Sequence, residues 1–66
     1  MKNLNNLKKI RKEAKITIKK ISQKLGITES YYWKIENGKR KLYYELAIKI
    51  AHIFNKKPDE LFYKDY

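Results

Sequence analysis

The apolar residues of this chain recur every three or four positions, which is the spacing of helices that bury one face. The first such segment carries its apolar stripe on one side and lysines on the other, and the stripe consists of Leu4, Leu7, Ile10 and Ala14. Two glycines and one proline are too few to supply the turns that a set of strands needs. The pattern therefore predicts an all-α fold.

Two helices in the middle of the chain are marked by their end residues. Thr17 and Thr28 are of the type that caps a helix at its N-terminus. After Thr17, apolar residues follow at three and four until Gly26, which suits the left-handed conformation at the end of a helix. Because only residues 26–28 separate the two helices, they must meet at a steep angle. Residues 17–36, approximately, are thus predicted to form a helix-turn-helix.

The C-terminal half predicts two more helices. The segment from Tyr44 to Phe54 is apolar nearly all round and is expected to be central; its stripe is Tyr44, Ala47, Ile48 and Ala51, with Leu46, Ile50, Ile53 and Phe54 beside it. Asn55 can adopt the left-handed conformation, and Pro58 suits the first turn of a short fifth helix carrying Leu61 and Phe62. We expect residues 1–66 to form one compact five-helix domain.

The charge balance narrows the class of partner. Lysine and arginine number 17 against 7 aspartates and glutamates, which gives the chain a net charge of +10. Such a surface attracts polyanions, with nucleic acid first, an anionic membrane surface second and acidic proteins third. The basic first helix is amphipathic, but a helix with a core stripe has the same pattern, so membrane binding is not predicted.

Several other classes of function find no support in the composition. There is no cysteine, and His52 is the single histidine, so neither a metal site nor a nucleophile and base at informative spacing is present. No enzymatic activity, cofactor or small-molecule ligand is predicted. No segment approaches about 18 continuous apolar residues, and the N-terminus has no apolar core of a signal peptide. The sequence predicts a cytoplasmic protein.

Three consecutive aromatic residues in the third helix raise a question of orientation. At about 100° per residue, one arc of this helix carries Glu29, Ser30, Trp33, Lys34 and Asn37, whereas Tyr32 and Ile35 lie opposite. Tyr32 is therefore predicted to enter the core, Trp33 to face outward and Tyr31 to lie at the border.

The outward arc has the chemistry to read bases. Ser30 is short enough for close approach, Lys34 can donate to guanine O6 or N7, and Trp33 offers an apolar face to a thymine methyl group. The alternative is a solvated helix face with Trp33 packed against a neighbour. Glu29 either accepts from a cytosine amine or simply stabilises the N-terminal end of the helix through its dipole. The sequence leaves both pairs of alternatives open.

Three segments carry a family resemblance: "KLGIT", "KIENGKR" and "LAIKIAHIFNKKPDELF". With these in register, residues 7–62 resemble the phage Cro and repressor type of helix-turn-helix domain, the XRE family. The resemblance implies a sequence-specific transcriptional regulator of double-stranded DNA, expected to be a repressor, with the helix 28–36 in the major groove. Because a single recognition helix reads too few base pairs for useful specificity alone, we also predict a homodimer on an inverted-repeat operator. The tail 61–66 and the turn between the last two helices are the candidate dimer surfaces.

The resemblance also assigns roles to particular residues. Together with the outward arc of the third helix, the resemblance leads us to predict base contacts from Glu29, Ser30, Trp33 and Lys34, and phosphate contacts from Thr17, Lys19, Tyr31, Asn37, Lys39, Arg40 and Tyr43. It further implies that Arg11 pairs with Glu36, for which a planar bidentate guanidinium is well suited.

The chain departs from the family at four positions. Ile18 stands where the family commonly has a phosphate-contacting glutamine, so Lys19 or Lys20 either replaces that contact or is simply solvated. Leu42 and Tyr43 replace the usual proline and hydroxyl cap before the fourth helix, and Tyr43 could reach a phosphate instead. Ser22 replaces a small alanine, which still permits close approach if its hydroxyl bonds to a carbonyl.

A second class of function remains open on the same fold. The aromatic residues Tyr31, Trp33, Tyr43 and Tyr63 could form a surface for a protein partner. The chain would then act as an interaction module, for example an antirepressor or an antitoxin-like partner binder.

Overall fold

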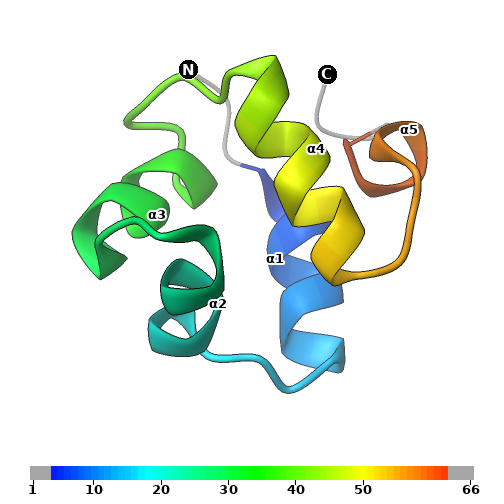
Figure 1. The fold of residues 1–66 in the computed structure, drawn as a ribbon, viewed down its shortest axis with the longest axis horizontal. Helices are drawn as coiled ribbons and strands as arrows, with labels where there is room; N and C mark the ends of the chain where they lie inside the picture. Colours follow the sequence, from blue (N-terminus) through cyan, green and yellow to red (C-terminus); the bar gives the residue numbers. More distant parts are fainter. Residues whose placement is uncertain (1–3, 63–66) are drawn as a thin grey trace.

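The computed structural model describes residues 4–62, which form five helices and no strands (Figure 1). The helices are α1 (Asn5–Glu13), α2 (Ile18–Leu25), α3 (Glu29–Glu36), α4 (Tyr44–Ile53) and α5 (Pro58–Phe62). The predicted all-α fold is confirmed. The longest of these helices has 10 residues, and none within 4–62 has the length and apolar content needed to span a membrane.

Every helix contributes to one core. α2 packs against α3 and α4, and α1 packs against α3 and α5, while α4 also contacts α5. The fully buried apolar and aromatic side chains at its centre are Leu7, Ile21, Tyr32, Ile35, Ile50 and Leu61. The first and last described helices thus lie side by side, and α4 crosses between α2 and α5 (Figure 1).

The predicted N-terminal caps are present. The Oγ1 atom of Thr17 accepts a hydrogen bond from the Lys20 N–H, and that of Thr28 accepts one from the Tyr31 N–H, both at 3.1 Å. α4 begins after Tyr43 without a side-chain cap, as expected because Tyr43 replaces the usual serine or threonine cap. Each threonine satisfies one of the backbone donors that the first turn of a helix leaves unpaired.

Four helices end in the same way, with one residue in the left-handed region. These residues are Lys15 (φ 58°), Gly26 (φ 71°), Gly38 (φ 72°) and Asn55 (φ 53°). At each end, two successive N–H groups donate to carbonyls of the last turn, as when Gly26 and Ile27 donate to Gln23 and Ser22. Gly26 and Asn55 were predicted in this conformation. Lys15 was not, because a lysine carries no sequence signal for it.

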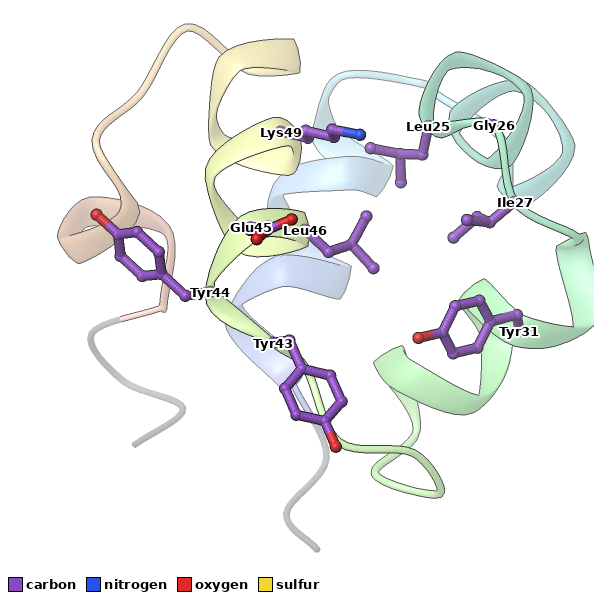
Figure 2. A pocket seen from close by; sticks show the side chains of 9 residues that line it. All are labelled: Leu25, Gly26, Ile27, Tyr31, Tyr43, Tyr44, Glu45, Leu46 and Lys49. Atoms are coloured by element: carbon purple, nitrogen blue, oxygen red, sulfur yellow. The ribbon is translucent and has the colours of Figure 1, made fainter.

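Some core predictions need correction. Ala14 and Tyr44 are exposed, Tyr44 by 76%. Ala14 follows the last residue of α1, where the chain turns away from the core, and Tyr44 lies in the first turn of α4 with its ring directed towards α5 (Figure 2). Leu61 and Phe62, proposed as dimer contacts, are buried inside the domain. Residues 63–66 of that tail lie outside the described residues.

One predicted detail of α2 is confirmed. The Ser22 hydroxyl donates to the Lys19 carbonyl at 3.0 Å, and Ser22 itself is buried. Because its polar group is satisfied within its own helix, serine can occupy this closely packed position.

The helix ends allow a paired test of backbone strain. Gly26→Ala is expected to lower the free energy of unfolding by about 1 kcal/mol, because a Cβ atom is disfavoured in the left-handed region. No neighbouring atom lies within 4 Å of that Cβ position, so a clash makes no contribution. Lys15→Gly should raise the free energy of unfolding by up to about 1 kcal/mol. Urea denaturation measures both, and changes of the same sign would contradict this account.

Candidate nucleic-acid interface

The helix-turn-helix is built from α2, the turn 26–28 and α3. Gly26 ends α2 and Thr28 caps α3, so the turn needs only Ile27 between them. The Ile27 side chain is partly buried against the core. Because α2 packs directly on α3, the two helices form one rigid unit that can present α3 to a partner.

The two sides of α3 have different environments. Tyr32, Ile35 and Glu36 are buried. The four residues expected to contact bases are all exposed: Glu29, Ser30, Trp33 and Lys34. Trp33 exposes 47% of its surface, so the protein covers about half of it and leaves the rest open. The exposed side of α3 can therefore meet a groove without loss of core packing.

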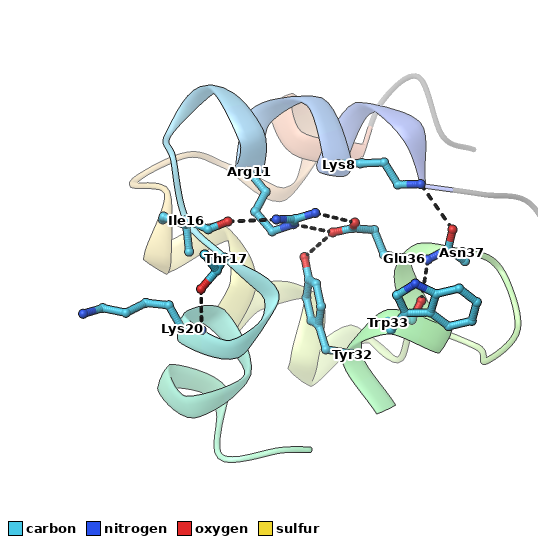
Figure 3. A network of polar contacts seen from close by, with 9 residues as sticks. All are labelled: Lys8, Arg11, Ile16, Thr17, Lys20, Tyr32, Trp33, Glu36 and Asn37. Atoms are coloured by element: carbon cyan, nitrogen blue, oxygen red, sulfur yellow. Dashed lines mark hydrogen bonds and ion pairs between the residues drawn. The ribbon is translucent and has the colours of Figure 1, made fainter. Parts of the chain in front are cut away.

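A buried polar network holds α3 against α1 (Figure 3). Arg11 donates twice to Glu36, from Nε to Oε2 at 2.9 Å and from Nη2 to Oε1 at 3.0 Å. Its third nitrogen, Nη1, donates to the Ile16 carbonyl at 2.8 Å. The Tyr32 hydroxyl donates to Glu36 Oε2 at 2.8 Å. The structure thus brings Arg11 and Glu36 together in the bidentate arrangement that the resemblance implied.

Arg11 and Tyr32 keep their protonation states around neutral pH. The hydrogen bond to Glu36 raises the pKa of Arg11 above its ordinary value, although burial acts in the opposite direction. Burial, and then the negative charge of Glu36, raise the pKa of Tyr32 far above its ordinary value. Arg11 therefore stays charged and Tyr32 stays a donor. Within residues 4–62, no buried side-chain nitrogen or oxygen lacks a hydrogen-bond partner.

A second set of contacts joins the C-terminal end of α3 to the start of α1. The Leu4 N–H donates to the Glu36 carbonyl at 2.9 Å. Lys8 Nζ donates to Asn37 Oδ1 at 3.2 Å, and Asn37 Nδ2 donates to the Trp33 carbonyl at 2.9 Å (Figure 3). Both polar ends of Asn37, which was expected to meet a phosphate, are engaged within the protein.

The loop between α3 and α4 carries three cations, and two of them lie over tyrosine rings. The Arg40 guanidinium lies 5.8 Å from the centroid of the Tyr31 ring, and the Lys41 ammonium lies 5.7 Å from that of Tyr43. Lys39 and Arg40 are exposed. Cations over aromatic faces are attracted to the ring electrons, so each tyrosine limits the positions of its cation.

Predicted base and phosphate contacts meet in one shallow depression. Its volume is about 410 Å³, and it is lined by Thr28, Ser30, Tyr31, Lys34 and Arg40. Two cations and three hydroxyl groups thus surround the start of α3. Thr17 and Lys19 lie apart from this depression, exposed at the beginning of α2.

Comparison with known proteins agrees with this geometry. A helix-turn-helix domain family matches residues 5–65 of the chain. The chain belongs to this helix-turn-helix family. It is also 41% identical over 56 residues to YqaE of Bacillus subtilis (strain 168), an uncharacterized HTH-type transcriptional regulator. That match covers 85% of the chain and 48% of the relative, so the chain spans about half the relative's length.

Several contacts of this helix-turn-helix domain were not predicted from the sequence. Tyr32 was assigned to the core without a polar role, although it lies four residues before Glu36, a spacing that brings side chains together on a helix. Lys8 carries no signal for its contact with Asn37, because that partner is 29 positions away.

Among residues 4–62, no three histidine, aspartate or glutamate side chains are grouped to hold a metal ion.

The ion pair of this helix-turn-helix domain can be tested by a double-mutant cycle. Arg11→Ala or Glu36→Ala should each lower the free energy of unfolding by about 3 kcal/mol, because each leaves a buried charge without its partner. The double variant should lose less than the sum of the two single losses, as measured by urea denaturation. Additive losses would show that the two side chains do not interact.

Proposed function

We propose that this chain is a sequence-specific DNA-binding transcriptional regulator that represses from a double-stranded operator. The observation that carries the proposal is the division of α3 into a buried side fixed by the Arg11–Glu36 network and an exposed side with base-reading chemistry. The net charge of +10 supports a polyanionic partner. Membership of the helix-turn-helix family and the name of the Bacillus relative support regulation of transcription.

In the proposed complex the exposed side of α3 lies in the major groove. Lys34 donates to guanine O6 or N7, and Trp33 packs against a thymine methyl group. Ser30 permits close approach at the start of the helix. Glu29 accepts from a cytosine N4 amine, which relieves the repulsion that its carboxylate would otherwise meet from phosphates.

Phosphate contacts would hold the helix in register. Lys39 and Arg40 would reach the backbone on one side of α3, with Tyr31 beside Arg40 and Tyr43 beside the neighbouring Lys41. At the start of α2, the Thr17 oxygen accepts from a backbone N–H, so its hydroxyl hydrogen remains able to donate to a phosphate. Lys19 adds charge there. The Asn37 Nδ2 group donates one of its two hydrogens to the Trp33 carbonyl, and the other would donate to a phosphate. Such contacts position a protein but carry no direct sequence information.

The proposed complex is a homodimer on an inverted repeat. One α3 helix reads too few base pairs to give useful specificity alone. The turn between α4 and α5 remains the candidate dimer surface, since Asn55, Lys56 and Lys57 are exposed there. Leu61 and Phe62 are excluded by their burial.

Selection of bound duplexes from a random pool tests specificity and symmetry together. We expect the selected sites to converge on an inverted repeat whose half-sites lie about 10 base pairs apart, centre to centre. The stoichiometry of the purified complex, measured by analytical ultracentrifugation, should be two protomers per duplex. One protomer on a site without symmetry would contradict the dimer.

Substitutions should separate base reading from phosphate attraction. Lys34→Ala is expected to weaken binding to the selected site by about 1–3 kcal/mol and to relax preference at one base pair. Lys39→Ala or Arg40→Ala should weaken binding to all sequences nearly equally. Each should also reduce the slope of log affinity against log salt concentration by about one per lost contact. Salt titrations of each variant against selected and scrambled duplexes measure these effects.

The three substitutions control for one another because each removes one cation from the same surface. If Lys34→Ala weakens both duplexes alike and leaves the preference unchanged, Lys34 does not read a base. If none of the three changes affinity, α3 and its following loop are not the DNA surface.

A further inference from the structure

An apolar groove runs between the α2–α3 turn and α4 (Figure 2). Its volume is about 730 Å³, and Leu25, Ile27 and Leu46 project into it from its two sides. The rings of Tyr31 and Tyr43 flank its other end, where Tyr43 exposes 64% of its surface. Neither base reading nor phosphate contact uses the three aliphatic side chains.

The groove continues along α4 beyond this depression. A second depression of about 430 Å³ shares Leu25 and Lys49 with the first and extends it to Ile48 and Ile53. Both isoleucines are only partly buried. Because α4 has 10 residues, the combined groove follows a helix of about 15 Å. That length matches roughly three turns of a second helix.

The charges around the groove indicate the sign of its partner. Lys49 reaches across from α4 towards Leu25 (Figure 2), and Lys24 and His52 line the second depression. Glu45 is the one acidic residue that lines either depression, and it lies beside Leu46 (Figure 2). The other charged side chains that line the two depressions include the cations Lys24 and Lys49, so the groove attracts a segment rich in carboxylates.

The surrounding architecture indicates the form of the partner. Residues 4–62 contain no strand, so this part of the chain offers no sheet edge to an extended peptide. A long apolar groove beside a helix is the surface on which an amphipathic helix places its apolar face. We propose that this groove docks an acidic amphipathic helix of a protein partner, with its apolar face on Leu25, Ile27 and Leu46 and its carboxylates near Lys24 and Lys49.

Docking would have a regulatory consequence for DNA binding. Tyr31 and Tyr43 flank the groove, and they also lie against Arg40 and Lys41 of the basic loop. A helix in the groove would contact both rings and bring negative charge next to that loop. The partner and DNA therefore exclude each other. This step rests on the proposed function, whereas the docking itself does not.

A synthetic peptide tests the docking without DNA. The probe is a helical peptide of about 12 residues, with leucine and phenylalanine on one face and glutamate on the other. Its control is a peptide of the same composition in scrambled order. The full chain is titrated with each peptide, and binding is followed by the NMR shifts of its backbone amides. The amphipathic peptide should bind at least about tenfold more tightly than the scrambled peptide. Its shifts should centre on the α2–α3 turn and α4.

Two matched variants separate the groove from general attraction. Lys49→Glu and Lys12→Glu each replace an exposed cation with a carboxylate, but Lys12 lies on α1, away from the groove. Lys49→Glu should weaken the amphipathic peptide at least about tenfold, whereas Lys12→Glu should change both peptides alike. Equal binding of the two peptides, or equal effects of the two variants, would overturn the proposal.

The remaining outcomes identify other occupants of the groove. If the amide shifts at the groove depend on protein concentration without peptide, the groove binds a second copy of the chain. If Lys49→Glu loses its preference among DNA sequences, the groove contacts DNA. Either result overturns the proposal. Displacement of a bound duplex by the amphipathic peptide supports exclusion, and simultaneous binding overturns it. If no duplex binds at all, the proposed function fails, while the peptide titration still decides the docking.

Discussion

The position of α3 depends on one buried ion pair. Arg11 joins three parts of the chain, since it donates to Glu36 on α3 and to the Ile16 carbonyl between α1 and α2 while standing on α1 itself. A buried pair of charges is costly to desolvate and is a poor source of net stability. Its geometry is nevertheless narrow, because a planar guanidinium meets a carboxylate in few orientations. The pair therefore determines where the exposed side of α3 lies more than it determines how stable the domain is.

The residues that hold α3 in place differ from the residues that it exposes to a partner. Tyr32, Ile35 and Glu36 are buried and hold α3 against the core. Within residues 4–62, the exposed side chains of Ser30 and Lys34 make no hydrogen bond with the core. The outward residues can change without removing a buried contact. The groove beside α4 is different, because Leu25 serves both the core and the groove. Substitutions there affect stability and docking together.

Much of the fold follows from local rules in the sequence. Thr17, Thr28 and Gly26 act through their own backbone neighbours, so their roles could be predicted from residue type and spacing alone. The exposure of Tyr44 and the contact of Lys8 with Asn37 depend on where distant elements lie, which periodicity does not report. The candidate base contacts could be placed on one side of α3 for the same local reason. Which of them meets a base depends on DNA, a partner outside the chain.

The contact of α1 with α5 affects the order in which the domain can form. Asn6 donates from Nδ2 to the Leu61 carbonyl at 2.7 Å, across 55 positions of sequence. During synthesis, the part of α1 that packs against α5 stays uncovered until α5 has left the ribosome. The pairing of α2 with α3 closes a much shorter loop and can form earlier. Proteolytic removal of α5 would expose the part of α1 that packs against it, so a cut after α4 would destabilise the domain without touching α3.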